Sequence, residues 1–308
     1  SQSMQKIREN VTQFAKNNVP LIIDGEIGSG RELAAQNIHY MSPRASGPFS
    51  EINCSTLPQD LIEIELFGIE KEMLPGIDKT RRGKIELMNG GTLLIEEIEE
   101  MPLFLQEKLV YFIKYNKFKR FGSSQEIYSD VRIILTSTEN IDSLKIKNKI
   151  HLQLVNLLDK SAMQMPPLRE RPEDVYSLVF HFSDIAAKQM ASLRKTISEQ
   201  GMKLMLKHNW PGNVRELKNF IERVYILTPS DFVDVHDLKF AGLVDKNSLG
   251  SASSEGNDFS TFREARAEFE KDFLIKKIQE NNGNISKTAE AIGLERSYLH
   301  RKIKAYGI

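Results

Sequence analysis

A glycine-rich octapeptide near the start of the sequence has the composition of a phosphate-binding turn. Its residues are Gly25, Glu26, Ile27, Gly28, Ser29, Gly30, Arg31 and Glu32. Glycines at this spacing let successive backbone N–H groups point at phosphate oxygens, and a helix that begins after the turn adds positive potential. A common phosphate loop ends in Gly-Lys-Ser or Gly-Lys-Thr, whereas this turn ends in Arg31-Glu32. The octapeptide predicts a phosphate site with an altered cation, and a glycine turn without a ligand is the alternative.

A second group of residues, near the C-terminus, could bind a polyanion. The chain carries 42 Lys and Arg against 42 Asp and Glu, so a case for nucleic acid must rest on a local excess of positive charge. Apolar residues on both sides of Gly293 predict two short helices; they are Ala289, Ile292, Leu294, Leu299 and Ile303. The side chains expected to face outward are Arg296, Ser297, Tyr298, His300, Arg301, Lys302 and Lys304. Such a helix can enter the major groove of double-stranded DNA, and a basic solvated helix is the alternative.

Short apolar runs that alternate with helical patterns are expected to position the glycine-rich turn. Val19–Ile23, Gly91–Ile95 and Val131–Thr136 predict strands, and their alternation with helices predicts a parallel α/β sheet. From about Arg171 the spacing of apolar residues becomes helical. The helices predicted there are Glu173–Lys188, Glu199–His208 and Val214–Leu227, with Asn213 as the N-cap of the last.

Changes in composition divide the chain into four segments. Residues 1–170 predict an α/β subdomain, and residues 171–243 a helical one. Residues 244–260 are rich in Ser, Gly, Asn and Asp and predict a flexible linker before a helical domain at residues 261–308. The apolar stripe of Phe262–Gln279 predicts a dimerisation helix, which implies a homodimer or higher homo-oligomer and a roughly palindromic DNA site.

The composition also excludes several classes of protein. No apolar stretch approaches the eighteen residues of a membrane span, and Ser1–Gln13 is too polar for a signal peptide, so we expect no membrane partner. Cys54 is the only cysteine, which excludes an intramolecular disulfide and fits a reducing cytoplasm. We expect Cys54 to be a small buried residue rather than a reactive thiol.

Long segments of the chain resemble the NtrC-type bacterial enhancer-binding proteins, the AAA+ activators of sigma-54 RNA polymerase. The similarity spans about Ser3 to Leu227 and resumes over Phe262–Ile308; matching segments are GEIGSGRELAAQNIHYMSPR, EINCSTLPQDLIEIELFG, GGTLLIEEIEEMPLFLQEKL, VRIIL, PPLRERPEDV and WPGNVREL. Asn284–Lys304 resembles the Fis-type helix-turn-helix that ends this family. The resemblance implies an α/β AAA+ P-loop domain, with a parallel sheet and flanking helices, an α-helical lid, and an all-α Fis-type helix-turn-helix domain.

Several positions that the family uses for ATP hydrolysis hold other residues here. By resemblance, the P-loop lysine falls on Arg31, the Mg²⁺-holding aspartate on Glu96, and the sensor asparagine on Thr138. The family's two arginines that reach a neighbouring subunit's nucleotide fall on His151 and Leu157. Arginine does not replace lysine in a tight phosphate cradle, and an arginine supplied in trans is worth about 10³–10⁵ in phosphoryl transfer.

We therefore expect a pseudo-ATPase without physiological hydrolysis. Glu97 matches the residue that orients the attacking water, and Asn53 matches its switch asparagine. Together with Arg31 and Glu96 they are interpreted as degenerate remnants, and neither a catalytic residue nor a metal site is assigned.

Nucleotide binding is a separate question, because most of the phosphate-binding residues are present. The residues assigned to it are Gly25, Glu26, Gly28, Ser29, Gly30, Arg31, Glu32, Asn37 and the lid's Arg215, which matches the family's second sensor. ATP or ADP is one candidate ligand. Cyclic di-GMP is another, since Gln36 and Asn37 resemble a helix of the family's flagellar and biofilm regulators, although His181 and Ile185 stand where their acidic and arginine partners are expected.

The family's sigma-54 contact loop is also altered. Phe67–Lys71 resembles the segment before that loop, but Glu72 replaces a glycine and Pro75 fixes φ and removes an N–H. We therefore expect a ligand-modulated regulator that works with the housekeeping RNA polymerase. The alternatives are a slow ATP-hydrolysing sigma-54 activator, and a repressor or scaffold whose AAA+ domain only oligomerises. By resemblance, a receiver or sensor domain is expected before Ser1.

Overall fold

Five parallel strands form the central sheet of this chain. In the computed structural model, residues 1–158, 161–243, 274, 284–291, 299 and 302–303 are described. The strands are β1 (Leu21–Asp24), β2 (Phe49–Asn53), β5 (Thr92–Glu96), β8 (Arg132–Ser137) and β9 (Ala162–Gln164), in the order β2-β5-β8-β1-β9. Every pairing between them is parallel, which confirms the predicted α/β sheet.

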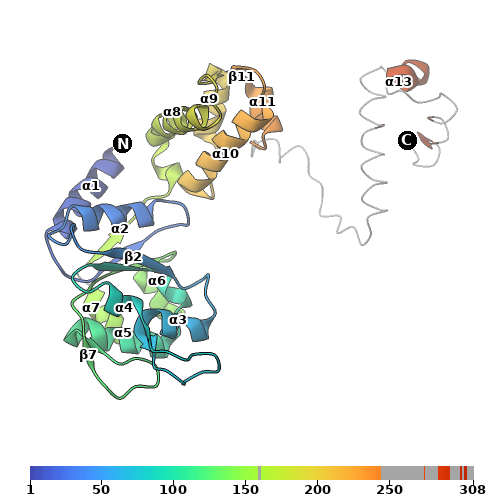
Figure 1. Cartoon of the computed structure of the whole chain (residues 1–308). Coiled ribbons are helices and arrows are strands. Elements are labelled where there is room, and N and C mark those ends of the chain that lie inside the picture. The colour runs from blue at the N-terminus through green and yellow to red at the C-terminus, as the bar shows by residue number, and fades with distance from the viewer. Residues whose placement is uncertain (159–160, 244–273, 275–283, 292–298, 300–301, 304–308) are drawn as a thin grey trace. The chain divides into compact units, whose positions relative to one another are not determined.

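Alternate side chains of β1, β5 and β8 enter two hydrophobic layers. Leu21 and Ile23 of β1 pack in the layer formed with α1 (Gln2–Ala15) and α2 (Arg31–Tyr40), whereas Ile22 packs in the opposite layer. This alternation follows from the two-residue repeat of a strand. In Figure 1, α1 and α2 lie on one side of the sheet, and α3 to α7 lie on the other.

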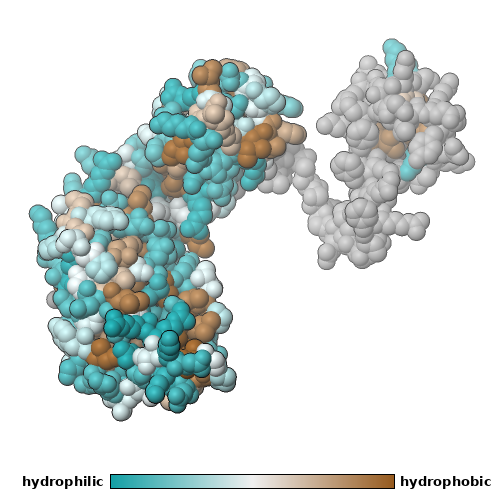
Figure 2. Space-filling view, in the orientation of Figure 1, coloured by the Kyte–Doolittle hydropathy of each residue, from teal (hydrophilic) through white to brown (hydrophobic). Residues whose placement is uncertain are grey.

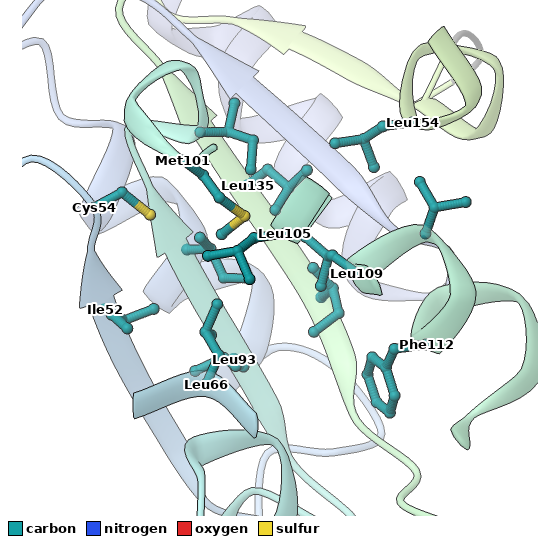
Figure 3. Close-up of a cluster of buried hydrophobic side chains, with 14 of the residues drawn as sticks. Ile52, Cys54, Leu66, Leu93, Met101, Leu105, Leu109, Phe112, Leu135 and Leu154 are labelled. Carbon is teal, nitrogen blue, oxygen red and sulfur yellow. The ribbon is translucent and has the colours of Figure 1, made fainter. Parts of the chain in front are cut away.

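The second layer is the larger core of the α/β domain. Figure 3 shows Ile52, Leu93 and Leu135 of the strands meeting Leu105 and Leu109 of α5 (Leu103–Tyr115). Helices α3 (Gln59–Phe67), α6 (Ile141–Ile146) and α7 (Leu152–Leu158) add to the same core. Because both faces are covered, the three central strands β1, β5 and β8 are buried almost throughout, as parallel strands between two helical layers require.

A helical subdomain follows the sheet. It contains α8 (Pro172–Gln189), α9 (Glu199–Lys207), α10 (Asn213–Leu227) and α11 (Val235–Phe240), with the short strands β10 (Thr196–Ile197) and β11 (Phe232–Val233). Pro172 occupies the first turn of α8, where a missing N–H costs nothing. Trp210 and Phe220 are central to its core. The helices predicted from periodicity match α8, α9 and α10 to within a residue or two.

Two strands of the sheet have no signal in the sequence pattern. Only Ile52 of β2 is fully buried, and β9 is three residues long with only Met163 buried. The remaining short elements are β3 (Gly68–Ile69), β4 (Arg81–Arg82), α4 (Lys84–Leu87), η1 (Ile98–Glu100), β6 (Lys117–Phe118), β7 (Ile127–Tyr128), η2 (Leu168–Glu170) and α13 (Ile285–Ala291).

The chain divides into two compact units, Ser1–Lys246 and Asn247–Ile308. In the second unit, Leu274, Ala289 and Leu299 are buried together, with Ile285 and Ile303 packed against them. Three of these five, Ala289, Leu299 and Ile303, were among the apolar residues predicted for the helix pair; Ile292 and Leu294 lie outside the described residues.

The visible surface of the first unit is mainly hydrophilic, with apolar patches between (Figure 2). Among the described residues, no helix has the length and apolar character needed to cross a membrane.

Candidate nucleotide site and DNA-binding segment

The glycine-rich turn connects β1 to α2 at the carboxyl end of the sheet. Gly25, Gly28 and Gly30 have φ values of 153°, 75° and 106°, a region that favours glycine. A Cβ on Gly28 would lie 2.3 Å from the carbonyl oxygen of Gly212, so no other residue fits without movement. The hydroxyl of Ser29 is buried and has no hydrogen-bond partner among the described residues. The turn has the backbone of a phosphate-binding loop.

Arg31 is buried at the start of α2 and points into a group of carboxylates. Its side chain is 6% exposed, and its Nη2 lies 3.8 Å from Oε1 of Glu97. Burial lowers the pKa of the guanidinium, while the charges of Glu99, Glu97 and Glu96 oppose that shift. Its Nη1 is buried without a partner in the described part of the chain. One donor of Arg31 is therefore free for an anionic oxygen.

The carboxylates around Arg31 come from the end of β5 and the turn after it. Burial raises the pKa of Glu96, and the charges of Glu32 and Glu51 add to the effect. Glu97 has a left-handed backbone, with φ of 55°, and its N–H donates to Oγ1 of Thr136 at 3.3 Å. These acids are the groups that would hold a divalent cation beside a nucleotide. They fit Mg²⁺ poorly, because the buried guanidinium already faces them.

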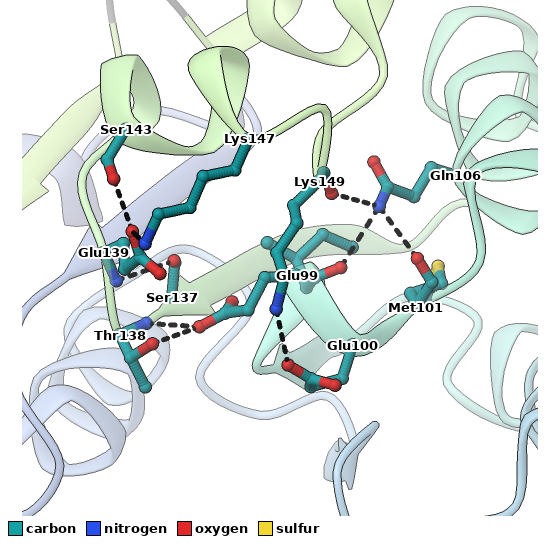
Figure 4. A network of polar contacts seen from close by, with 11 residues as sticks. Glu99, Glu100, Met101, Gln106, Ser137, Thr138, Glu139, Ser143, Lys147 and Lys149 are labelled. Atoms are coloured by element: carbon teal, nitrogen blue, oxygen red, sulfur yellow. Dashed lines mark hydrogen bonds and ion pairs between the residues drawn. The ribbon is translucent and has the colours of Figure 1, made fainter.

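A polar network joins the turn after β5 to the segment after β8 (Figure 4). Thr138, at the family's sensor position, donates from its N–H and its hydroxyl to one oxygen of Glu99, at 2.7 and 2.5 Å. Gln106 donates to the carbonyl oxygens of Ile98, Met101 and Lys149. The side chain of Thr138 is thus held by a carboxylate from the turn after β5.

The two positions that the resemblance assigns to the family's trans arginines hold a histidine and a leucine, His151 and Leu157. The N–H of His151 donates to Oε1 of Gln106 at 2.8 Å, and Nδ1 of His151 is buried without a partner among the described residues. Leu157 packs against the larger core. The neighbouring lysines are engaged elsewhere: Lys147 pairs with Glu139, and Lys149 with Glu100.

The lid is fastened directly to the glycine-rich turn through Asn213. This residue was predicted to be the N-cap of α10, and that prediction is wrong: Gly212 is the N-cap, and Asn213 is the first helical residue, with φ of 54°. The side chain of Asn213 instead bonds to the backbone of two distant segments. Its Oδ1 accepts from the N–H of Leu168 at 2.7 Å, and its Nδ2 donates to the carbonyl oxygen of Ile27 at 3.0 Å.

Three further contacts extend this clamp. The N–H of Val214 donates to the carbonyl oxygen of Gly28, and Nη2 of Arg171 donates to that of Ser29. Arg169 binds the carboxylate of Glu26 with both of its terminal nitrogens, at 2.7 and 2.6 Å. Neither arginine was singled out from sequence, although both lie in the segment PPLRERPEDV.

The other residues predicted for the nucleotide site differ in whether they lie near the glycine-rich turn. Arg215 is exposed in the first turn of α10, close enough to Arg31 to lower the pKa of its guanidinium. Asn37 donates to the carbonyl oxygen of Leu33 within α2. Asn53 accepts from the N–H and the hydroxyl of Ser55, at 2.8 and 2.7 Å. The fold thus brings Arg215 to the turn, while Asn37 and Asn53 make local bonds.

A cluster of Asp234, His236 and Asp237 lies at the start of α11. Asp234 and Asp237 form a capping box there, each side chain accepting from the other residue's N–H at 3.0 Å. Capping accounts for these carboxylates without a metal ion.

The loop at the family's sigma-54 contact position is closed by its own backbone. Glu72 has φ of 65°, its N–H donates to the carbonyl oxygen of Ile77 at 2.8 Å, and the N–H of Ile77 donates to that of Leu74. Met73 and Leu74 are 43% and 41% exposed at its tip.

Of the predicted DNA-binding residues, only Lys302 is described, and it is partly buried. The other six lie outside the described residues: Arg296, Ser297, Tyr298, His300, Arg301 and Lys304. Their roles remain predictions.

A glycine-rich turn after β1, carboxylates after β5 and a helical lid fastened to the turn define an AAA+ nucleotide-binding domain. Residues 1–163 match the family described as Sigma-54 interaction domain, residues 169–254 the AAA+ ATPase lid domain, and residues 265–306 the bacterial regulatory protein, Fis family. The chain therefore belongs to the sigma-54 interaction domain family of DNA-binding transcription regulators, as its resemblance to the NtrC type predicted.

Named relatives and solved structures agree with this assignment. The chain is 36% identical to the nitrogen assimilation regulatory protein NtrX of Azorhizobium caulinodans, across 100% of this chain and 68% of the relative. It is 34% identical to the regulatory protein AtoC of Escherichia coli, across 100% and 67%. The structure of NtrX from Brucella abortus in complex with ADP matches with a TM-score of 0.74 and 36% identity, covering 100% of this chain and 68% of that one. The same protein in complex with ATP matches with a TM-score of 0.73 and 35% identity over the same shares.

Proposed function

We propose that this chain is a DNA-binding transcription regulator whose AAA+ domain binds a nucleotide without hydrolysing it and acts independently of sigma-54. The observation that carries the proposal is the position of Arg31. Its buried guanidinium faces Glu96, Glu97 and Glu99, which are the acids that would otherwise hold Mg²⁺ and orient water.

Two further features of the site favour the loss of hydrolysis. Phosphoryl transfer depends on cations that neutralise the developing charge, and a trans arginine supplies much of that effect. His151 and Leu157 cannot supply it, and Thr138 is engaged by Glu99. Each of these features weakens the charge stabilisation that the reaction requires.

Several features favour binding of a nucleotide. The turn keeps the three positive-φ glycines, Nη1 of Arg31 is unpartnered, and Arg215 stands beside it. NtrX of Brucella abortus, a structural relative, is known in complexes with ADP and with ATP. ATP or ADP is therefore the first candidate ligand. Cyclic di-GMP remains a hypothesis, because Gln36 and Asn37 bond within their own helix.

The altered loop at Glu72–Ile77 favours action with the housekeeping polymerase. Pro75 and two internal backbone bonds restrain a loop that would have to move on each hydrolysis cycle. A regulator without a power stroke needs no such movement. We propose that the regulator acts in the cytoplasm, as a homodimer or higher homo-oligomer.

The DNA contacts are proposed for the C-terminal segment. We divide the chain into an α/β subdomain (1–170), a lid (171–243), a linker (244–260) and a helix-turn-helix domain (261–308). Arg296→Ala should weaken binding to a specific site by about 1–3 kcal/mol, the usual cost of losing an arginine contact to a base. Lys188→Ala, on an exposed face of α8, is the matched control.

A second candidate function is that of an ordinary ATP-hydrolysing sigma-54 activator. The named relatives and the retained Glu97 favour it. Transcription in vitro separates the candidates: the first predicts stimulation of the housekeeping polymerase, and the second predicts ATP-dependent stimulation of the sigma-54 polymerase alone. A repressor or scaffold would stimulate neither.

The fate of a bound nucleotide tests the proposal directly. The full chain is incubated with ATP and Mg²⁺, separated from free nucleotide, denatured, and its nucleotide identified by chromatography. We expect intact ATP at a stoichiometry near one per chain. Recovery of ADP alone would contradict the lack of hydrolysis, and recovery of no nucleotide would contradict the binding.

A further inference from the structure

The lid contains a cavity that shares no lining residue with the glycine-rich turn. It measures about 340 Å³ and lies between α8, the segment before β10, and the start of α9. Its walls include Tyr176, Val179, Phe180, Ser183, Arg194 and Met202. We call it the lid cavity. This volume is within the range of pockets that bind small molecules.

One side of the lid cavity is aromatic. The rings of Tyr176 and Phe180, one helical turn apart on α8, have centroids 4.7 Å apart and are tilted by 52°. Val179, Ile197 and Met202 complete an apolar lining. Such walls favour a flat, apolar body, which gains both from leaving water and from contact with the rings.

Polar groups converge on the same cavity. Ser183 is only 3% exposed, and its hydroxyl makes no hydrogen bond within the described parts of the chain. The guanidinium carbon of Arg194 lies 5.0 Å from the centre of the Phe180 ring. Its ion pair with Asp184, at 3.3 Å, joins two half-exposed side chains, so it is weak and can be exchanged for another anion.

A buried cation adds positive potential to this wall. Lys195 is 9% exposed, and its Nζ donates to the carbonyl oxygens of Thr228 and Ser230, each at 2.8 Å. Among the described residues, no carboxylate lies within salt-bridge distance of it. Glu199, at the cavity's edge, is paired with Lys203. The cavity wall therefore includes a buried cation, Lys195, that has no ion-pair partner among the described residues, while the carboxylate of Glu199 is mostly exposed to solvent.

We propose that the lid cavity binds a small organic acid with a flat apolar body. The body packs against Phe180 and Tyr176, and the carboxylate accepts from the Ser183 hydroxyl and the Arg194 guanidinium. An ionised acceptor makes the stronger hydrogen bonds with such donors, so the acid should be preferred over a neutral analogue of the same shape.

Calorimetric titration of the full chain tests this site with defined probes. Phenylacetate and indole-3-acetate are the acids, and phenylacetamide is the neutral analogue. We expect a Kd on the order of 1 mM or tighter for at least one acid, since these are small ligands, and about tenfold weaker binding of the amide.

Variants locate the binding in the cavity. Ser183→Phe fills it, and Arg194→Gln removes the charge at its edge; each should weaken the acid about tenfold. Lys188→Gln, an exposed change on the same helix, should leave the affinity unchanged. Thermal unfolding checks that Ser183→Phe is folded, and Arg194→Gln tests the site if it is not. The proposal is overturned by no binding of either acid, by equal binding of acid and amide, or by affinity that neither cavity variant alters.

Discussion

Nη2 of Arg31 lies 3.8 Å from Oε1 of Glu97, and only 6% of the arginine side chain is exposed. Arg31, which the resemblance assigns to the family's P-loop lysine position, thus faces Glu97, which it assigns to the water-orienting position. The two groups partly neutralise one another inside the site. A carboxylate in this arrangement has less free charge for a metal ion or for an attacking water.

Removal of the Arg31 charge should destabilise the unliganded protein. Arg31→Ala leaves Glu96, Glu97 and Glu99 facing one another without a cation, and loss of one partner of a buried pair costs roughly 3 kcal/mol. Arg31→Lys keeps the charge and should cost less than half as much. Denaturant unfolding at pH 7 measures both. Equal stability of Arg31→Ala and the parent protein would show that the guanidinium does not neutralise the surrounding carboxylates. Arg8→Ala, an exposed change in α1, controls for the loss of one positive charge.

Asn213 should contribute more to the free energy of unfolding, through the contact between the lid and the glycine-rich turn, than a helix N-cap usually does. Asn213→Ala leaves the buried N–H of Leu168 and the carbonyl oxygen of Ile27 without their bonds, at a cost of roughly 3 kcal/mol. Asn213→Gly loses the same bonds but adopts positive φ freely, so it should be about 1 kcal/mol less damaging. Chemical denaturation compares the pair. Asn219→Ala, an exposed change on the same helix, is the control. If Asn219→Ala lowered the free energy of unfolding as much as Asn213→Ala does, the clamp would be refuted.

Glu96 should destabilise the unliganded protein at neutral pH. Burial raises its pKa in the folded state, so the folded protein binds this proton more tightly than the unfolded chain does. The resulting loss in the free energy of unfolding is absent below the ordinary glutamate pKa of 4.5. It is complete above the raised pKa of Glu96 in the folded protein. Glu96→Gln should therefore raise Tm by a few degrees at pH 8 and by nothing at pH 4. A gain of equal size at both pH values would contradict this account, and Glu107→Gln on α5 is the exposed control.

Cys54 should be inert in the folded protein. It is buried, and burial together with the charges of Glu99, Glu97, Glu100 and Glu96 raises the pKa of its thiol to about 12. At pH 8 the thiolate fraction is then about 10⁻⁴, and only the thiolate reacts. Iodoacetamide followed by mass spectrometry should find no adduct until the protein is unfolded in guanidinium chloride. Complete labelling of the folded protein on the same timescale would contradict the burial.

Much of this architecture could be predicted from local patterns. The turn at Gly25–Glu32 follows a strand and precedes a helix, which requires a parallel sheet around it. Glu96 is the last residue of another buried strand and Glu97 follows it, and the carboxyl ends of parallel strands meet at one edge. Periodicity located α8 and α10 because both pack one apolar face on the lid core.

The remainder depends on contacts between distant segments. Asn213 has the sequence context of an N-cap, and only the packing of the lid on Ile27 and Gly28 assigns its side chain to another task. The bond between Glu99 and Thr138 joins residues 39 positions apart, with no local signal. Strand β9 pairs with β1 through three residues, too few to make a pattern.

Steady-state phosphate release tests the central claim most directly. The full chain is assayed with ATP, Mg²⁺ and a DNA site, beside Glu97→Gln. We predict that the parent protein and Glu97→Gln release phosphate at the same background rate. A parent rate on the ordinary enzymatic scale of about 1 s⁻¹ or more that is abolished by Glu97→Gln would contradict the account and establish an ATP-hydrolysing activator.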